Sequence, residues 1–153
     1  MKQKDLIFLS HLRQNSRQTL TAISKQTNIP ISTLFDRLKV HEGNIIRKHT
    51  TLIDFGKLGY QCRANIVLKV NIDQRTEAMD YLNLQPCVNS LYKINNGYDF
   101  MIEGIFHHVK EMEDFMEIFE KKFVVKQQDV YYIIEDLKRE SFLGGPNFLN
   151  ISG

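Results

Sequence analysis

The sequence predicts an α+β protein with a mainly helical first half and a βαββαβ second half. Apolar residues recur at three- and four-residue steps up to about residue 40, and at two-residue steps from residue 66. Charge also divides the chain, since residues 1–60 carry ten Lys and Arg against four Asp and Glu, whereas residues 61–153 carry ten against fourteen. A basic half joined to an acidic half predicts that only the first half meets a polyanion.

Three short helices are expected in the first half, separated by turn-forming residues. The first covers residues 4–14, where apolar residues repeat with helical spacing. Thr19 is a suitable N-cap for the second, because its hydroxyl can accept a hydrogen bond from a free amide of the first turn. Asn28 tolerates the left-handed backbone needed for a sharp exit. Pro30 has a fixed φ that suits a helix start, so the third helix is expected to begin close to Pro30 or Ile31.

The third helix is amphipathic and is the expected DNA-reading element. Its buried stripe is expected to comprise Ile31, Leu34, Phe35 and Leu38. Its outward face is expected to hold Ser32, Thr33, Asp36, Arg37 and Val40, with Lys39 on the flank. Short hydroxyl side chains let a helix approach base edges, and Arg pairs bidentately with guanine or a phosphate. Asp36 is interpreted as an i,i+3 partner of Lys39, with acceptance from a cytosine amino group as the alternative.

The residues after the third helix predict a basic β-ribbon. Gly43 and Asn44 are turn residues, and a β-branched, Thr-rich run follows that carries Arg47 and Lys48. Two helices joined by a tight turn and followed by such a ribbon are typical of a winged helix-turn-helix, in which the last helix enters the major groove and the ribbon contacts the DNA backbone. The local positive charge favours double-stranded DNA as the partner, because phosphate neutralisation supplies most non-specific affinity.

The second half is predicted to be a ferredoxin-like domain with both helices on one face of the sheet. Asn96 and Gly97 supply the positive φ angles of a hairpin turn. The expected strands are residues 66–72, 88–94, 100–106 and 130–134, and the expected helices are residues 73–84 and 109–123. The methionines and phenylalanines of the second helix are interpreted as core.

The opposite sheet face is more apolar than one chain requires, because Met101 and Ile105 point away from the helices. Self-association through this face is therefore expected. The domain organisation predicted from these patterns is a DNA-binding domain over residues 1–50, a connector over 51–62, an effector-binding and oligomerisation domain over 63–140 and a tail over 141–153.

Several classes of function are not expected. Apolar runs are too short for a signal peptide or a membrane span, so the protein is expected to be cytoplasmic with no membrane partner. Cys62 and Cys87 lack metal-ligand spacing and are interpreted as packed thiols. Neither a Ser/His/Asp set nor a Cys/His set appears, so no enzymatic activity, metal or cofactor is expected.

These residues resemble a known family. The stretch "ISTLFDRLK", the connector "LIDFGKLGY" and the turn "GYDF" are similar to the Lrp/AsnC, or feast/famine, transcription regulators, and the resemblance covers the chain to about residue 140. It implies a dimer, often assembled into larger rings or discs such as octamers, that binds semi-palindromic promoter sites. It also implies an amino acid or related metabolite as effector, held between C-terminal domains. Asn28 stands where a glycine is usual, and "GGPNFLNISG" departs from the common C-terminal end.

The resemblance also implies roles for individual residues. The recognition helix would present Ser32, Thr33 and Arg37 to DNA, with Gln18 and Lys39 available to phosphates. Together with the basic ribbon and the expected helix cap, the candidate DNA-binding residues are Gln18, Thr19, Ser32, Thr33, Arg37, Lys39, Arg47 and Lys48. The candidate effector-binding residues are Gly97, Tyr98 and Asp99, where Asp99 would accept from a ligand's amino group.

Two alternative functions remain open at this point. Haem-pathway decarboxylases resemble the same two-domain architecture, but they are expected to need basic and imidazole groups around a tetrapyrrole, and the acidic second half offers few. A ligand-sensing assembly module with a vestigial helix-turn-helix is the other alternative. DNA titrations at several salt concentrations distinguish these from a regulator.

Overall fold

The computed structural model describes residues 2–145, and residues 146–153 of the expected tail lie outside that range. The chain forms two compact units, which are described separately. The first comprises residues up to 52 together with the segment that begins at Leu137, and the second comprises residues 53–136. Within the first unit, the segment after residue 137 contacts the first helix, since Arg13 Nη2 donates to the backbone oxygen of Glu140 at 2.9 Å.

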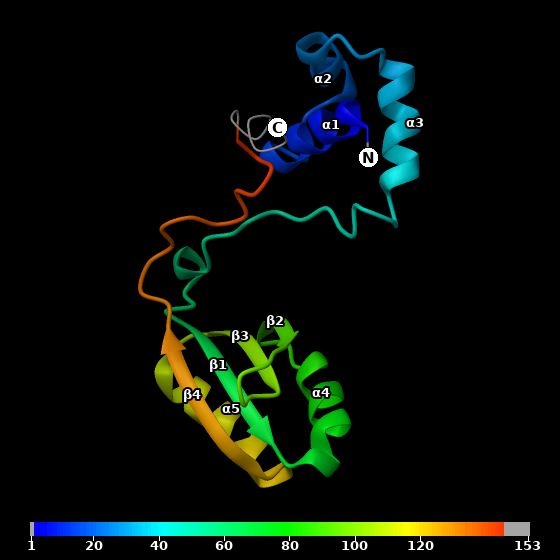
Figure 1. Cartoon of the computed structure of the whole chain (residues 1–153). Coiled ribbons are helices and arrows are strands. Elements are labelled where there is room, and N and C mark those ends of the chain that lie inside the picture. The colour runs from blue at the N-terminus through cyan, green and yellow to red at the C-terminus, as the bar shows by residue number, and fades with distance from the viewer. Residues whose placement is uncertain (1, 146–153) are drawn as a thin grey trace. The chain divides into compact units, whose positions relative to one another are not determined.

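The first unit contains the three expected helices, which are α1 (Gln3–Gln14), α2 (Leu20–Thr27) and α3 (Ile31–His41) (Figure 1). Their boundaries follow from local chemistry. The Thr19 hydroxyl accepts from Ala22 N at 3.1 Å and caps α2, and Asn28 leaves that helix with φ 57°. Pro30 immediately precedes α3. The helix-turn-helix arrangement expected from the sequence is confirmed.

The core of the first unit is small, and the expected buried stripe of α3 is only partly buried. Its fully enclosed side chains are Phe8, Ile23, Ile29 and Leu34. Leu38 is half-buried against them, whereas Ile31 and Phe35 are 47% and 48% exposed. The expectation that these last two are buried was wrong, because α1 and α2 together offer α3 a narrow apolar surface that Leu34 and Leu38 already cover.

The expected wing is reduced to a turn. Gly43 has φ 74°, and a single parallel bridge joins Glu42 to Ile46. Residues 47–54 form no strand, so the β-ribbon expected there is not formed. A short two-stranded ribbon is marginally stable without a further strand or helix to cover it, which accounts for the difference.

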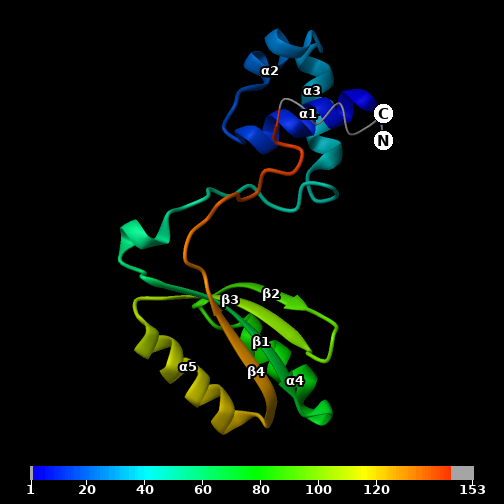
Figure 2. The ribbon, with the colours of Figure 1, turned by 60° about the vertical axis from the view of Figure 1, so that its left-hand side comes forward.

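The second unit has the predicted βαββαβ order. Its main elements are β1 (Cys62–Val70), α4 (Arg75–Asn83), β2 (Val88–Lys93), β3 (Phe100–Phe106), α5 (Val109–Lys122) and β4 (Val125–Tyr132), with short 3-10 turns η1 (Phe55–Leu58) and η2 (Ile72–Gln74). The sheet order is β2-β3-β1-β4, and every neighbouring pair is antiparallel. Both helices cover the same face of the sheet (Figures 1 and 2). The predicted α+β class, a helix-turn-helix followed by a ferredoxin-like domain, is confirmed.

Two strands differ from their predicted bounds by more than one residue. The strand expected over residues 66–72 is β1, Cys62–Val70, and the strand expected over residues 130–134 differs at both ends. The structure begins β4 at Val125, five positions before the expected Val130, and ends it at Tyr132. Four of the five added residues, Lys126 to Asp129, are polar and therefore gave no apolar alternation, yet the segment pairs along β1 as an edge strand, where polar side chains remain in water.

The two faces of the sheet differ. The face under the helices is closed by large apolar side chains, and the residues that fill it include Ile66, Leu68, Phe100, Ile102, Phe106, Met112, Met116 and Phe119. On the other face Met101 and Ile105 are half-buried, as expected, but Arg63 and Glu103 share that face with them. It is thus a mixed surface. Within residues 2–145, no helix combines the length and the apolar character needed to cross a bilayer.

Candidate DNA-binding face and effector region

The solvent side of α3 carries one continuous stripe, which we call the recognition face. It consists of Ser32, Phe35, Asp36 and Lys39, spaced at i, i+3, i+4 and i+7, and all four side chains are exposed. The turn at Asn28 and Pro30 sets the direction in which α3 leaves α2. The stripe therefore presents a hydroxyl, an aromatic ring, a carboxylate and an ammonium group together, which is a set able to make polar and apolar contacts with base edges.

The four candidate residues on α3 divide into two pairs. Ser32 and Lys39 are exposed on the recognition face, whereas Thr33 and Arg37 are half-buried beside it. The Nζ of Lys39 lies over the ring of Phe35, 4.5 Å from its centroid, rather than beside Asp36. Among the described residues Asp36 forms no ion pair, so the expected pairing with Lys39 is not found.

Arg37 forms an ion pair with a buried acid on α1 that was not among the candidate residues. Asp5, on α1 and only 4% exposed, lies 3.1 Å from Arg37 Nη1 and 3.2 Å from His41 Nε2 through its Oδ1. Asp5, Arg37 and His41 are here called the Asp5 cluster. Arg37 and His41 lie one turn apart, so the cluster joins the second half of α3 to α1. Arg37 is thus held against α1 by Asp5. The sequence predicted a side chain free on the outward face of α3, and the structure differs from that prediction.

Electrostatics of the Asp5 cluster favour the charged carboxylate. Burial alone would raise the pKa of Asp5, but the hydrogen bond from His41 and the charge of Arg37 outweigh it, so the pKa lies below its ordinary value. Helical spacing from Leu34 and Leu38 also places His41 on the inner side of α3. The position of His41 on the inner side of α3 was the sequence feature that could have indicated a buried acidic partner.

The remaining candidate DNA contacts lie on either side of α3. The Thr19 hydroxyl is used in capping α2, and Gln18 Nε2 donates to Gln26 Oε1 at 3.2 Å. Arg47 and Lys48 are exposed on the irregular segment that replaces the wing. Their charges are available to phosphates, although no β-ribbon fixes them.

The candidate effector residues occupy the β2-β3 hairpin. Asn96 and Gly97 have φ 62° and 87°, as a tight hairpin turn requires. Asp99 is buried, accepts from Val70 N at 2.9 Å and pairs with Arg75 Nε at 2.8 Å through its other oxygen. Both carboxylate oxygens thus anchor the hairpin to the end of β1 and the start of α4, and Asp99 does not present a free acceptor to a ligand's amino group.

Tyr98 joins the hairpin to the edge strand β4. Its hydroxyl is hydrogen-bonded to the Asp129 carboxylate and accepts from Gln127 Nε2 at 2.9 Å. The hydrogen bond to Asp129 is the largest of the influences that raise the pKa of Tyr98, so the phenol stays protonated. Gly97, Tyr98 and Asp99 therefore lie together, with Gly97 exposed, Tyr98 half-buried and Asp99 buried.

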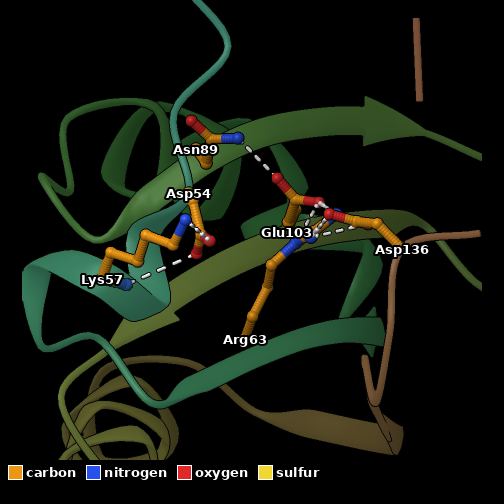
Figure 3. A network of polar contacts seen from close by, with 6 residues as sticks. All are labelled: Asp54, Lys57, Arg63, Asn89, Glu103 and Asp136. Carbon is orange, nitrogen blue, oxygen red and sulfur yellow. Dashed lines mark hydrogen bonds and ion pairs between the residues drawn. The ribbon is translucent and has the colours of Figure 1, made fainter. Parts of the chain in front are cut away.

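A second polar network lies across β1, β2 and β3 (Figure 3). Arg63 pairs with Glu103 at 3.0 Å, and its Nη1 contacts both carboxylate oxygens of Asp136 at 2.8 Å. Asn89 Nδ2 donates to Glu103 as well. Sequence reasoning did not identify this network, because its members are far apart in the chain. It fixes the residues that follow β4 to the sheet.

An open groove of about 330 Å³ lies between α5 and β4. Three glutamates and two methionines are among its lining residues, which are Met112, Glu113, Met116, Glu117, Glu120, Gln128, Val130 and Tyr132. Lys121 donates to Glu117, and Gln128 donates to Glu120. The groove is therefore an acidic, partly apolar surface in the same unit as the hairpin.

This geometry defines a class of protein, a helix-turn-helix chain with a ferredoxin-like C-terminal domain. No family model matches the sequence. The chain is 29% identical over 115 residues to the HTH-type transcriptional regulator FL11 of Pyrococcus horikoshii, covering 74% of this chain and 76% of that protein.

Solved structures share the fold. The transcriptional regulator NMB0573 of Neisseria meningitidis, in complex with L-Met, superposes with a TM-score of 0.82 at 18% identity over 91% of this chain and 93% of that one. An AsnC family transcriptional regulator from Agrobacterium tumefaciens gives 0.80 at 16% identity over 91% and 94%. The resemblance to the Lrp/AsnC regulators that the sequence indicated is thereby confirmed.

Proposed function

We propose that the protein is a sequence-specific DNA-binding transcription regulator that inserts α3 into the major groove. The observation that carries this proposal is the recognition face, an exposed stripe on the second helix of a helix-turn-helix within the basic half of the chain. The similarity to FL11, which is named as an HTH-type transcriptional regulator, supports it.

The residues take different parts in this proposal. Ser32 and Lys39 approach base edges and phosphates directly, and Thr33 lies beside them at the start of α3. Arg37, held by Asp5, reaches a phosphate at the rim of the groove. Gln18 and the free amides at the capped start of α2 meet the backbone, and so do the side chains of Arg47 and Lys48.

The second unit is proposed to bind an amino acid or related metabolite and to join copies of the chain. The L-Met complex of a structural neighbour supports an amino-acid effector. Gly97 and Tyr98 remain the proposed contacts, with Asp99 holding the hairpin in place. The mixed outer sheet face, with Met101 and Ile105 half-buried, is the proposed dimer surface. Residues 1–50 and 63–140 are the proposed functional domains, joined by residues 51–62.

DNA titration at several salt concentrations tests the main proposal. A regulator that neutralises several phosphates loses affinity steeply as salt rises and prefers some sequences over others. Salt-insensitive or absent binding would favour an enzyme or an assembly module instead.

A thermal-shift screen over the amino acids tests the effector separately. One amino acid is expected to raise the melting temperature of the wild-type chain, because a ligand that binds only the folded state stabilises it. Tyr98→Phe is expected to reduce that shift. A shift that Tyr98→Phe leaves unchanged, but Met116→Ala abolishes, would place the ligand in the groove between α5 and β4.

A further inference from the structure

Phe35 is an exposed aromatic side chain at the centre of the recognition face. It lies between Ser32 and Lys39, and nearly half of its surface is accessible to solvent. The core does not need it, because Leu34 and Leu38 already fill the contact between α3 and the small apolar core of its unit. Ile31, one helical turn before Phe35, is 47% exposed as well, so the two form a neighbouring apolar pair on the surface of α3. Neighbouring apolar side chains exposed among polar ones indicate a binding contact.

The chemistry of the neighbouring residues indicates what that contact is. Ser32 is small and lets the helix approach the floor of a groove, and Lys39 places a positive charge directly over the ring. The formal charge of residues 1–60 is that of a polyanion-binding surface. An ammonium group held 4.5 Å from the ring centroid favours a partner that offers anionic and apolar groups side by side.

The major groove of DNA is such a partner. The C5-methyl group of thymine is the apolar group on its base edges, and phenylalanine is among the side chains that contact it. We propose that Phe35 is a specificity-determining residue that reads a thymine methyl group, while Lys39 meets a phosphate beside it. This inference rests on the proposed function and adds the base type that the helix prefers.

The test starts from a binding site selected in vitro from random duplexes with the full-length chain. Each thymine of that site is then replaced singly by deoxyuridine, which removes only the methyl group. The wild-type chain is expected to lose affinity by about fourfold at one or two thymines, the effect of uncovering one methyl-sized group. Phe35→Ala is expected to bind the unmodified site more weakly and to lose nothing further at those thymines.

Two further variants keep the result interpretable. Ile118→Ala removes an equally exposed apolar side chain, 50% accessible, from α5 in the other unit, and it should retain the wild-type response to deoxyuridine. Phe35→Leu keeps an apolar side chain and should retain part of the response. Circular dichroism and size-exclusion chromatography of each variant establish its fold and oligomer size.

Each other outcome overturns the inference. Wild-type binding that is indifferent to every deoxyuridine substitution shows that no methyl group is read. A Phe35→Ala variant that keeps the full wild-type response assigns the methyl contact to another residue. If Phe35→Ala changes oligomer size but not base preference, Phe35 covers a protein interface. If no sequence is enriched at all, the proposed function fails, and the inference fails with it.

Discussion

The helices α3 and α5 carry the same apolar periodicity, yet the structure buries them to different extents. On α5 the apolar stripe is enclosed, with Met112, Met116 and Phe119 all buried against the sheet. On α3 only Leu34 is fully buried along the expected stripe, and Phe35, its neighbour in sequence, is exposed. The difference follows from what each helix packs on, because a four-stranded sheet covers a wide stripe and two short helices cover a narrow one.

An apolar residue on a helical face is therefore buried only where the surface that the helix packs on is wide enough to cover it. The apolar side chains of α3 that remain exposed lie on the surface proposed to contact DNA. On α5 the exposed side instead carries acids and lysines in i,i+4 pairs, such as Glu117 with Lys121. The helix α3 thus leaves apolar side chains on the surface proposed to bind a partner, while α5 uses most of its apolar side chains in its own core.

The largest expected effect lies on α5. Phe119→Ala is expected to destabilise the second unit by about 4 kcal/mol, because it removes a fully enclosed aromatic ring and leaves a cavity. Ile118→Ala, next to it and half exposed, is expected to cost less than about 1 kcal/mol. Amide hydrogen exchange, which resolves the two units, measures both. Equal costs would contradict the packing described for α5.

The same pairing on α3 gives a smaller contrast. Leu34→Ala is expected to destabilise the first unit by about 3 kcal/mol, whereas Phe35→Ala is expected to change its stability by less than about 1 kcal/mol. Hydrogen exchange of the amides in residues 3–41, recorded at increasing denaturant concentrations, measures both changes in the free energy of unfolding. If Phe35→Ala were as destabilising as Leu34→Ala, Phe35 would belong to the core after all.

The Asp5 cluster offers the next effect. Asp5→Asn is expected to destabilise the first unit by about 2 kcal/mol at neutral pH, since it weakens hydrogen bonds from two charged or polar partners. The pKa of Asp5 is lowered in the folded state, so its contribution is present above the ordinary value of 3.8 and is lost as pH falls through the lowered value.

Stability against pH therefore checks the Asp5 cluster directly. Unfolding of the wild-type first unit, followed between pH 2 and 6, should show a loss of stability at low pH that Asp5→Asn lacks. A variant with the same acid dependence as the wild type would mean that another carboxyl governs it.

The smallest expected effect concerns Lys39. Lys39→Gln is expected to lower DNA affinity uniformly across sequences and to reduce the slope of log affinity against log salt by about 1, the effect of losing one phosphate contact. Lys126→Gln, on β4 of the acidic unit, is the matched control and should leave the slope unchanged. A change confined to a single base pair of the site would indicate that Lys39 reads a base instead.

Sequence reasoning succeeded where local chemistry decides the structure. The cap at Thr19, the left-handed turn at Asn28, the helix start after Pro30 and the Asn96–Gly97 hairpin each depend on residues within a few positions. The strand Phe100–Phe106 was likewise predicted with its observed bounds, since its apolar alternation is strong.

What could not be predicted depends on contacts between distant residues. Asp5 and His41 are 36 positions apart, and Arg63 and Asp136 are 73 apart, so neither pairing leaves a local pattern. The start of β4 was missed because its first residues are held by hydrogen-bonded pairing with β1 at the sheet edge and show no apolar alternation. The exposure of Phe35 was missed because apolar periodicity shows which face of a helix is apolar. It does not show how wide the surface is that packs against that face.

Methylation interference on the selected duplex shows whether the recognition face of α3 lies in the major groove. The N7 atom of guanine faces the major groove, and the N3 atom of adenine faces the minor groove. Methylation at guanine N7 within the site is expected to block binding of the full-length chain, whereas methylation at adenine N3 should leave it largely intact. Interference at adenine N3 alone would contradict that placement.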